Sequence, residues 1–593
     1  MTKLMLLVVL TLKLSLVVAA QSQLAPSVNQ PSDKSLTDKV DQLFAEWNKP
    51  DSPGCALGVI KDGKIIYKRG YGMANLDHSV PLSSTSVFYI ASISKQFTAA
   101  SVALLARQGK LSLDDDIRKY LPEMPQYEAP ITIRQLIHHT SGIRDWAELM
   151  WLAGMPDENI YTEQEFIDLI ARQKRLNFKP GEKYLYSNSG YFLLSQIVKR
   201  ASGQSLRQFA EENIFKPLGM KNTHFHDDRT MIVKNRATGY FPSKDGFSVV
   251  LTNFDKVGDG GLLTTVEDLY LWDQNFYDNK LGGGPALLNQ LLTPGTLNGG
   301  EKLNYAFGLV VGQYKELRNV WHGGSYLGFR TFISRFPEQK FSVICLCNLS
   351  NINPEKLGDQ VTDIYLADQL KAGEVAASKS PVPEPAPVKV SEQELISKMG
   401  WYYNQDEKLL RSLALKDGKL MFVRGPGNES ELLPLGEGRF QMKGVTTKTD
   451  VIFKSPREGV SPEMDVLVEG QNPSIFGAIA SPTEAELAGY VGDYYSEDLR
   501  TTFNILAKNG DLFLTAKSIP ELKLLRAIKD EFTSDDVTIT FTRDTQNRVS
   551  GFYLNGDRVK NLEFVKKAAE RKTRNKTRVY ETMPRTQLKP KYR

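Results

Sequence analysis

Ser92 and Lys95 stand three positions apart in the run Ser-Ile-Ser-Lys, and this pair is suited to acyl transfer. Residues three apart share one face of a helix, so the Lys95 amine is expected beside the Ser92 hydroxyl. A serine hydroxyl becomes an effective nucleophile when a neighbouring base takes its proton, and N–H groups at a helix start stabilise an oxyanion. The same spacing also occurs by chance in many chains, so it does not establish a catalytic site by itself.

Two further motifs carry groups that acyl transfer needs. Tyr186-Ser-Asn188 precedes a predicted helix, and positive charge near a phenol lowers its pKa from about 10, which makes Tyr186 a candidate general base. A turn tyrosine that caps the helix is the alternative. The run His322-Gly-Gly-Ser325 precedes a strand predicted from residue 328, and its glycines would let a substrate backbone approach closely. Taken alone, this run is only a glycine turn.

The order Ser-x-x-Lys, Tyr-x-Asn, His-x-Gly resembles the serine β-lactamase and penicillin-binding protein superfamily, in its class C-like branch. That branch also contains D,D-peptidases, D-aminopeptidases and esterases. Three more runs are similar to family motifs, at residues 136–143, 217–220 and 260–268. The resemblance covers residues 35–370 and implies a serine hydrolase with a β-lactamase/transpeptidase-like fold.

The resemblance also implies a role for each motif residue. Ser92 would be the nucleophile, Lys95 would assist proton transfer, and Tyr186 would be the general base. Asn188 would orient Lys95 and the substrate amide, and the backbone N–H groups of Ser92 and Ser325 would form the oxyanion hole.

His322, Gly323 and Gly324 complete the predicted substrate-binding residues. The family often has a lysine where this chain has His322. A histidine with a pKa near 6.5 is largely neutral, whereas lysine is a fixed positive charge. The resemblance therefore favours ester, peptide or D-amino-acid amide substrates over penicillins. Neither a cofactor nor a metal is predicted, because the adjacent His138 and His139 point apart and the sequence shows no third ligand.

The elements that must position these residues are predicted from local patterns. Lys61-Asp-Gly63 joins two β-rich runs as a hairpin, since Asp-Gly supplies positive φ. The expected strands are 55–60, 64–68, 306–311, 328–336 and 341–347, and the expected helices are 92–108, ended by Gly109, and 189–201, ended by Gly203. Strands at both ends of a region with helices between them predict an α+β fold, an antiparallel sheet packed with helices and a helical subdomain.

The C-terminal third of the chain repeats with an offset of 92 residues. Met399-Gly-Trp-Tyr-Tyr matches Val491-Gly-Asp-Tyr-Tyr, and Asp417-Gly matches Asn509-Gly. Short alternating runs separated by turn residues predict two all-β repeat modules, small barrels or half-barrels. These modules resemble the accessory barrels of D-aminopeptidase-like proteins.

Composition divides the chain further and suggests export. We predict a signal peptide at 1–20, a flexible lead-in at 21–34, the hydrolase domain at 35–370, a Pro-rich linker at 371–393, β modules at 394–484 and 485–568, and a disordered basic tail at 569–593. A retained membrane anchor is the alternative at the N-terminus. From Lys566 onward eleven Lys or Arg face two Glu, so the basic charge is concentrated there and the bulk of the chain is no nucleic-acid binder. Three cysteines are interpreted as buried free thiols, with a pair formed by Cys55 as the alternative.

The sequence thus predicts a periplasmic or secreted serine hydrolase that forms an acyl-enzyme at Ser92. Its substrate would be a small molecule or peptide with an ester, an amide or a D-amino acid, and cell-wall peptide is one option. The alternatives are a class C-like β-lactamase or D-Ala-D-Ala carboxypeptidase, and a non-catalytic envelope-binding protein that retains the fold. No transmembrane span is expected after signal cleavage.

Overall fold

The computed structural model describes residues 34–156, 159–249, 253–370, 387–407, 409–425, 428–445, 447–454, 462–479, 483–517, 519–534 and 536–568. The predicted signal peptide and basic tail, and nearly all of the predicted lead-in, lie outside these residues. So does most of the predicted linker, at 371–386. Within the described ranges, no helix has both the length and the apolar character needed to cross a bilayer.

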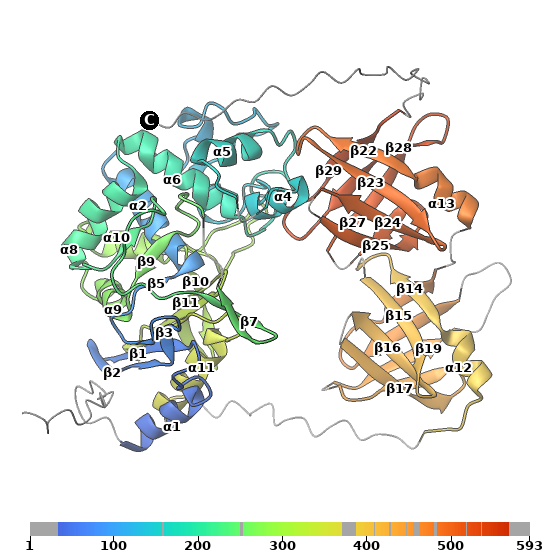
Figure 1. The fold of residues 1–593 in the computed structure, drawn as a ribbon, viewed down its shortest axis with the longest axis horizontal. Helices are drawn as coiled ribbons and strands as arrows, with labels where there is room; N and C mark the ends of the chain where they lie inside the picture. The colour runs from blue at the N-terminus through green and yellow to red at the C-terminus, as the bar shows by residue number, and fades with distance from the viewer. Residues whose placement is uncertain are drawn as a thin grey trace, which may run out of the picture.

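A six-stranded antiparallel sheet forms the framework of the N-terminal domain (Figure 1). In spatial order its strands are β10 (Val310–Tyr314), β11 (Leu317–Tyr326), β12 (Phe329–Phe336), β13 (Phe341–Cys347), β1 (Cys55–Lys61) and β2 (Lys64–Tyr71). The β1–β2 hairpin turns at Asp62 and Gly63, with φ of 48° and 75°, as the Asp-Gly signal predicts. The first and last strands of the domain therefore pair at the centre of the sheet.

Both faces of this sheet are buried. On one face, α1 (Lys34–Phe44) and α11 (Pro354–Tyr365) pack through Val40, Phe44 and Val361. On the other face, α9 (Val266–Asn275) lies so close to β1 that a Cβ at Gly58 would meet Val266 at 2.4 Å. Burial on two sides explains why β1 is apolar at almost every position.

The remaining helices form a subdomain against the second face, between β5 and β10 in the chain. These elements are η1 (Ala91–Ser94), α2 (Lys95–Arg107), η2 (Ile117–Lys119), α3 (Ile133–Ile137), α4 (Trp146–Ala153), α5 (Glu163–Ala171), α6 (Asn188–Ser202), α7 (Leu206–Ala210), η3 (Glu211–Phe215), α8 (Lys216–Leu218) and α10 (Gly284–Leu291). Short strands complete the domain: β3 (Met73–Asn75), β4 (Val80–Pro81), β5 (Phe88–Tyr89), β6 (His224–Phe225), β7 (Tyr240–Ser243), β8 (Gly246–Val249) and β9 (Leu262–Thr264).

Two local predictions need correction. The predicted helix 92–108 begins with the 3₁₀ turn η1, and the α-helix starts only at Lys95. The predicted strand 306–311 is wrong, because β10 starts at Val310 and pairs with β11, a strand missed in the sequence. Their hairpin turns at Lys315 and Glu316, with φ of 45° and 69°, and neither residue is a usual sign of such a turn.

The C-terminal region forms two closed, eight-stranded antiparallel barrels. The first contains β14 (Gly400–Asn404), β15 (Leu409–Lys416), β16 (Lys419–Gly425), β17 (Asn428–Gly436), β18 (Arg439–Met442), β19 (Thr449–Phe453), β20 (Glu463–Val468) and β21 (Ser474–Ala478), after helix α12 (Glu392–Lys398). The second contains β22 (Gly492–Ser496), β23 (Thr501–Lys508), β24 (Asp511–Ala516), β25 (Ile519–Ile528), β26 (Glu531–Thr533), β27 (Thr538–Arg543), β28 (Val549–Asn555) and β29 (Leu562–Lys566), after helix α13 (Glu484–Tyr490).

The internal repeat reproduces backbone geometry as well as topology. Asp417 and Gly418 turn β15 into β16 with φ of 50° and 73°, and Asn509 and Gly510 turn β23 into β24 with 54° and 80°. The predicted fold class, an α+β domain followed by two all-β modules, is confirmed.

The second barrel packs on the N-terminal domain beside α4 (Figure 1). The contact is anchored by a salt bridge of 2.9 Å between Arg144 and Asp498, whose side chains are 0% and 9% exposed. Arg144 also donates to the backbone oxygens of Lys560 and Asn561, in the loop that joins β28 to β29. A buried guanidinium with this many partners fixes the orientation of the barrel.

A disulfide joins Cys55 and Cys347, which lie directly opposite each other on β1 and β13. The preferred interpretation of three free thiols is therefore wrong. Only Cys345 is a free cysteine among the described residues, and it is buried. The sequence could not reveal the pairing, because it depends on strands 292 residues apart becoming neighbours.

Candidate active site

Ser92 is presented by a short, strained turn between a strand and a helix. Ala91, immediately before it, has φ of 47°, a conformation that non-glycine residues rarely adopt and that clusters at functional sites. The Ile90 N–H donates to Leu262 O at 3.1 Å, which ties the turn to β9. Ser92 is half-buried, so its hydroxyl remains reachable from solvent.

The Lys95 side chain is completely buried and makes three hydrogen bonds. Its amine nitrogen lies 3.1 Å from Ser92 Oγ, 2.9 Å from Asn188 Oδ1 and 2.7 Å from the backbone oxygen of Asp259. Burial lowers the pKa of Lys95 to about 8, although the nearby charge of Asp259 opposes this shift. At pH 7 about a tenth of this amine is therefore unprotonated, compared with less than a thousandth for an ordinary lysine, and the unprotonated form is the one that a catalytic base needs.

Tyr186 completes the group around Ser92. A hydrogen bond joins its phenol to Ser92, and the Lys95 nitrogen lies 4.8 Å from its ring centroid. The structure thus brings Ser92, Lys95 and Tyr186 together. Burial raises the pKa of Tyr186 above its usual value and outweighs the lowering by the Ser92 hydrogen bond and the Arg558 charge. The expectation that nearby positive charge lowers this pKa below its usual value is therefore wrong.

Asn188 is held by a buried aspartate that sequence reasoning missed. The backbone N–H of Asn188 donates to Asp145 Oδ2 at 2.6 Å, while Asp145 Oδ1 accepts from the N–H of Ala147 at the start of α4. One carboxylate thereby ties the first residue of α6 to α4. This places the Asn188 amide oxygen where it accepts from Lys95.

A buried ion pair supports the other side of Lys95. Lys256 lies 3.0 Å from Asp259, and Trp146 Nε1 donates to the same carboxylate at 3.0 Å. The Lys256 amine also stands 3.7 Å above the Trp146 ring. This pairing fixes the backbone at Asp259, whose oxygen accepts from Lys95. Trp146 therefore lines the site with a definite structural role.

The predicted substrate-binding run lies within β11, not in a turn before a strand. Its pairing with β10 ends at Trp321, so β10 leaves the edge from His322 to Tyr326 uncovered. A Cβ at Gly324 would meet Ile90 O and Thr331 Oγ1, each at 2.3 Å. Glycine is therefore required for β11 to pass beside the turn that carries Ser92, which places the Ser325 backbone next to the nucleophile's segment.

His322 is buried and already satisfied by protein partners. Its Nδ1 lies 2.6 Å from Gly323 O, and its Nε2 lies 3.0 Å from the Tyr305 hydroxyl. Burial lowers the pKa of His322 to about 4, so the ring is neutral at pH 7. Nδ1 then donates to the carbonyl and Nε2 accepts from Tyr305. The absence of a fixed charge agrees with the expectation from histidine at this position.

These groups open onto a pocket of about 690 Å³. Ser92, Tyr186, Asn188 and the run from His322 to Ser325 all line it, together with residues from several other segments. The additional polar lining includes Lys256, Asp259, Arg330 and Arg558. The pocket is large enough for a peptide-sized ligand and contains the serine, so it is the candidate active site.

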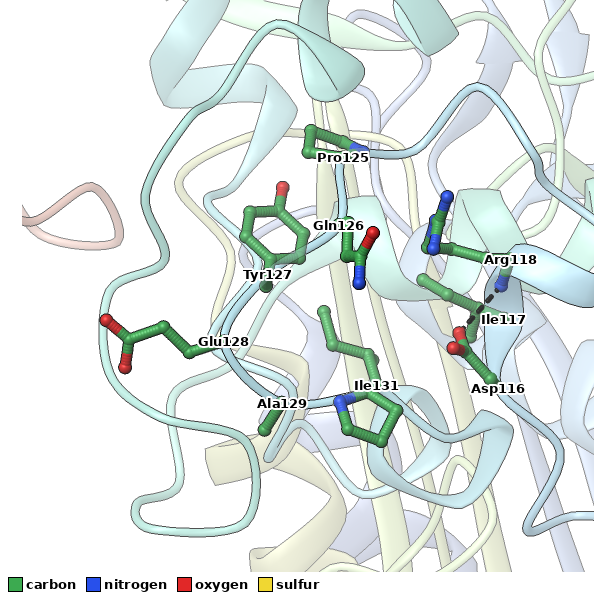
Figure 2. Close-up of a pocket in the computed structure, with 10 residues that line it drawn as sticks. Asp116, Ile117, Arg118, Pro125, Gln126, Tyr127, Glu128, Ala129 and Ile131 are labelled. Atoms are coloured by element: carbon green, nitrogen blue, oxygen red, sulfur yellow. Dashed lines mark hydrogen bonds between the residues drawn. The ribbon is translucent and has the colours of Figure 1, made fainter.

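A smaller pocket of about 160 Å³ lies elsewhere, between Asp116 and Ile131 (Figure 2). Its Asp116 carboxylate accepts the N–H of Arg118 at 2.9 Å, and the Tyr127 hydroxyl donates to Gln173 O at 3.0 Å. Glu128 points away from it (Figure 2). Asp116 and Tyr127 thus have structural partners, and the pocket carries none of the predicted site residues.

The arrangement of fold and motifs agrees with comparisons to known proteins. The family model described as Beta-lactamase matches residues 40–366, more than half of the chain. The chain belongs to the Beta-lactamase family. This confirms the resemblance drawn from the motifs, and the serine hydrolase class is confirmed as the class of its relatives.

Curated relatives in the Beta-lactamase family include a penicillin-binding protein of Bacillus subtilis (strain 168), 33% identical over 48% of this chain and 66% of that protein. A D-aminopeptidase of Gluconobacter oxydans (strain 621H) is 29% identical over 50% of this chain and 56% of that protein. The chain thus spans less than two thirds of the length of these relatives. The octameric penicillin-binding protein homologue from Pyrococcus abyssi shares the fold, with a TM-score of 0.52 and 24% identity over 75% of this chain and 99% of that one.

Several site residues of this Beta-lactamase family member had no signal in their own sequence neighbourhood. Asp145, Asp259 and Tyr305 act through contacts between distant segments. The His139 ring packs at a tilt against the Tyr186 ring, with centroids 4.2 Å apart, and His139 Nδ1 accepts the N–H of Ser187. In the sequence, the sign that His139 belongs to the site was its position in the run 136–143, which is similar to a family motif. Among the described residues, the one cluster with metal-ligating side chains is formed by the three cysteines, two of which are in the disulfide.

Proposed function

We propose that this chain is a serine hydrolase in which Ser92 attacks an ester, an amide or a D-amino-acid-containing peptide and becomes acylated. The observation that carries this proposal is the hydrogen bond of 3.1 Å between Ser92 and a buried lysine whose pKa is lowered to about 8. A buried lysine beside a serine is costly unless its unprotonated form is used.

The neutral amine of Lys95 is held in the orientation that proton transfer needs. It has two N–H groups, and two fixed acceptors, Asn188 Oδ1 and Asp259 O, stand within 3 Å of it. With both N–H groups engaged, the lone pair faces Ser92 Oγ. Lys95 therefore takes the Ser92 proton as the oxygen attacks the substrate carbonyl, and an ester bond forms between Ser92 and the acyl group.

Tyr186 acts as a neutral phenol in this scheme. Because burial raises its pKa, it keeps its proton at pH 7 and serves as a hydrogen-bonding relay beside Ser92. The proton taken by Lys95 passes through this group to the leaving alcohol or amine, and the bond from the carbonyl carbon breaks. Water then attacks the acyl-enzyme by the same route in reverse. The proposed general base is therefore Lys95, whereas the family resemblance implied Tyr186.

The developing oxyanion would be stabilised at η1 and the edge of β11. The N–H of Ser92 and the N–H of Ser325 are the two donors that we propose for the oxyanion hole. Gly324 supports this assignment, since its missing side chain lets the two segments touch.

The substrate proposal rests on relatives and on charge. Relatives are named D-aminopeptidase and penicillin-binding protein. The neutral His322 offers no fixed charge to a substrate carboxylate, so such a charge would have to come from other residues of the pocket, such as Arg330 and Arg558. Esters, amides and D-amino-acid peptides, including cell-wall peptides, are therefore the substrate classes to test first.

We further propose that the protein works in the periplasm or outside the cell. The Cys55–Cys347 disulfide supports this location, because such bonds persist mainly in oxidising compartments. Mass spectrometry of the mature N-terminus in the exporting host tests it, and an uncleaved N-terminus in protein confined to the cytoplasm would contradict it.

A fluorophosphonate probe tests the nucleophile directly. We expect covalent labelling of the wild type and none of Ser92→Ala. Ser94→Ala is the matched control in the same motif, because the Ser94 hydroxyl is buried and accepts the Leu262 N–H at 3.1 Å. Labelling of Ser92→Ala at the wild-type rate would reject the proposal.

Substrate class is tested with a panel of p-nitrophenyl esters, D-alanine p-nitroanilide, D-Ala-D-Ala peptides and nitrocefin. Turnover that is lost in Ser92→Ala assigns the class. Nitrocefin hydrolysis would make the protein a β-lactamase in activity as well as in family. Ligand binding without labelling or turnover would instead support a non-catalytic envelope-binding role.

A further inference from the structure

The second barrel contributes a side chain to the active-site pocket. The loop between β28 and β29 carries Arg558, which lines the same pocket as Ser92 although 466 positions separate them. Its guanidinium carbon lies 5.1 Å from the centre of the Tyr186 ring. A charged group of the accessory module is thus stacked beside the catalytic residues.

The loop is clamped in place through its backbone. Glu148 of α4 accepts the N–H groups of Asp557 and Arg558 at 2.9 and 2.5 Å. Asn177 donates to Arg558 O at 2.8 Å and accepts the N–H of Lys560 at 2.7 Å. Because these contacts use backbone atoms, they fix where residue 558 stands and leave its side chain available for another role.

Besides its contact with the Tyr186 ring, the Arg558 guanidinium has one weak ion pair among the residues that the structure describes. Its ion pair is with the adjacent Asp557 at 3.3 Å, and the two side chains are 37% and 84% exposed. Exposed pairs of this kind contribute little. The nearby carboxylates are engaged elsewhere, since Glu148 binds the loop backbone and Asp259 binds Lys256.

We propose that Arg558 is a specificity-determining residue that binds a carboxylate of the substrate and selects anionic acyl donors. This inference rests on the proposed function and adds that the substrate is negatively charged. A guanidinium presents a planar pair of N–H donors that matches a carboxylate. Arg330 and Glu355 also line the pocket, and the Arg330 guanidinium donates to the backbone oxygens of Leu327 and Phe329, so Arg558 is the cation that we assign to the substrate.

The same charge disfavours cationic substrates. The free ammonium group of a D-amino-acid amide would be repelled when it enters beside Arg558. N-acylated or dicarboxylic donors, which lack that ammonium, would not be. The barrel thereby adds to the charge preference of the pocket, and this preference separates the chain's substrates from simple D-amino-acid amides.

Two sets of esters test the preference on both sides of the scissile bond. The first is phenyl acetate with its 3-carboxy and 3-trimethylammonio derivatives, which place the charge on the leaving group. The second is p-nitrophenyl hexanoate, mono-p-nitrophenyl adipate and p-nitrophenyl 5-(trimethylammonio)pentanoate, which place it on the acyl group. Each substrate is compared between wild type and variant, so differences in intrinsic reactivity cancel.

In Arg558→Gln we expect kcat/KM to fall about tenfold for the carboxylate in at least one set, because a charge-assisted bond is lost. The cationic ester of that set should gain about threefold, and the neutral esters should stay within about twofold. Arg558→Lys should keep part of the preference, and added salt should reduce it in the wild type. Arg548→Gln is the matched control, an arginine of the same barrel that is 72% exposed.

If Arg558→Gln turns over neutral esters and the charge preference changes in neither set, the role of Arg558 is overturned and the proposed function stays intact. Absence of labelling and turnover in the wild type would reject the proposed function instead. A binding measurement keeps the two separable: Ser92→Ala should bind 3-hydroxybenzoate about tenfold more tightly than Ser92→Ala/Arg558→Gln does. Equal calorimetric affinities would also overturn the proposal.

Discussion

The Lys95 amine nitrogen lies 3.1 Å from the Ser92 hydroxyl oxygen, and the Lys95 side chain is completely buried. Burial alone would make this lysine inert or destabilising. In the proposed mechanism two oriented acceptors make it a directed base, because with both of its N–H groups engaged the lone pair points toward Ser92. The tuning of Lys95 therefore comes from the elements packed around α2, namely α6 and the segment at Asp259.

The pH dependence of the reaction should report Lys95. Its pKa of about 8 lies below the ordinary value, and the base is active only when unprotonated. We expect kcat/KM to rise about tenfold per pH unit below pH 8 and to level off above it. Lys95→Arg should lower kcat/KM about 10³-fold and should remove its rise with pH below pH 8. A limb centred above pH 10 would instead assign proton acceptance to Tyr186.

Gly324→Ala tests whether the close packing of β11 beside the turn that carries Ser92 is needed for activity. The added Cβ would meet the backbone oxygen of Ile90 at 2.3 Å, so β11 must move away from the turn that carries Ser92. We expect kcat to fall about 100-fold, since misplaced oxyanion donors have costs of this size. Gly323→Ala is the matched control, because its Cβ would find its nearest neighbour at 3.7 Å. Equal kcat values for the two variants would contradict the packing argument.

Much of the active site was predictable from the sequence because its motifs are local. Ser92 and Lys95 are placed by helix geometry, and Tyr186 and Asn188 by the start of the next long helix. The assignment of the base was not predictable. It depends on how strongly burial acts on Lys95 and Tyr186, and burial is set by segments distant in the chain.

The features that sequence analysis missed share one physical cause. The β10–β11 hairpin turns at Lys315-Glu316, so the usual glycine or asparagine signal is absent. The disulfide forms only when β1 and β13 become neighbours in the sheet. Arg558 reaches the pocket only when the second barrel docks on the N-terminal domain. Each feature depends on tertiary contact between segments whose local patterns are ordinary. The repeat of the two barrels was visible, by contrast, because its turns recur at a fixed offset.

Asp498→Ala should weaken the attachment of the second barrel. It would leave the Arg144 guanidinium buried without its carboxylate, which costs about 3–5 kcal/mol in comparable pairs. We expect earlier unfolding in urea and faster proteolysis of the β28–β29 loop. Glu521→Ala removes a carboxylate of the same barrel from an exposed pair with Lys508 and should cost about 0–1 kcal/mol. Equal losses in the two variants would refute a special role for Arg144.

Removing the Cys55–Cys347 disulfide should lower the free energy of unfolding substantially. The bond closes a loop with a sequence separation of 292, and constraint of the unfolded chain over such loops contributes about 3–5 kcal/mol. Cys55→Ala/Cys347→Ala should show this loss in denaturant, and reduction should have no further effect on it. Cys345→Ala is the control, because it removes one buried sulfur from the same strand and should cost about 1 kcal/mol while leaving sensitivity to reductant unchanged. A wild-type midpoint that does not respond to reductant under denaturing conditions would show that the two cysteines are not bonded.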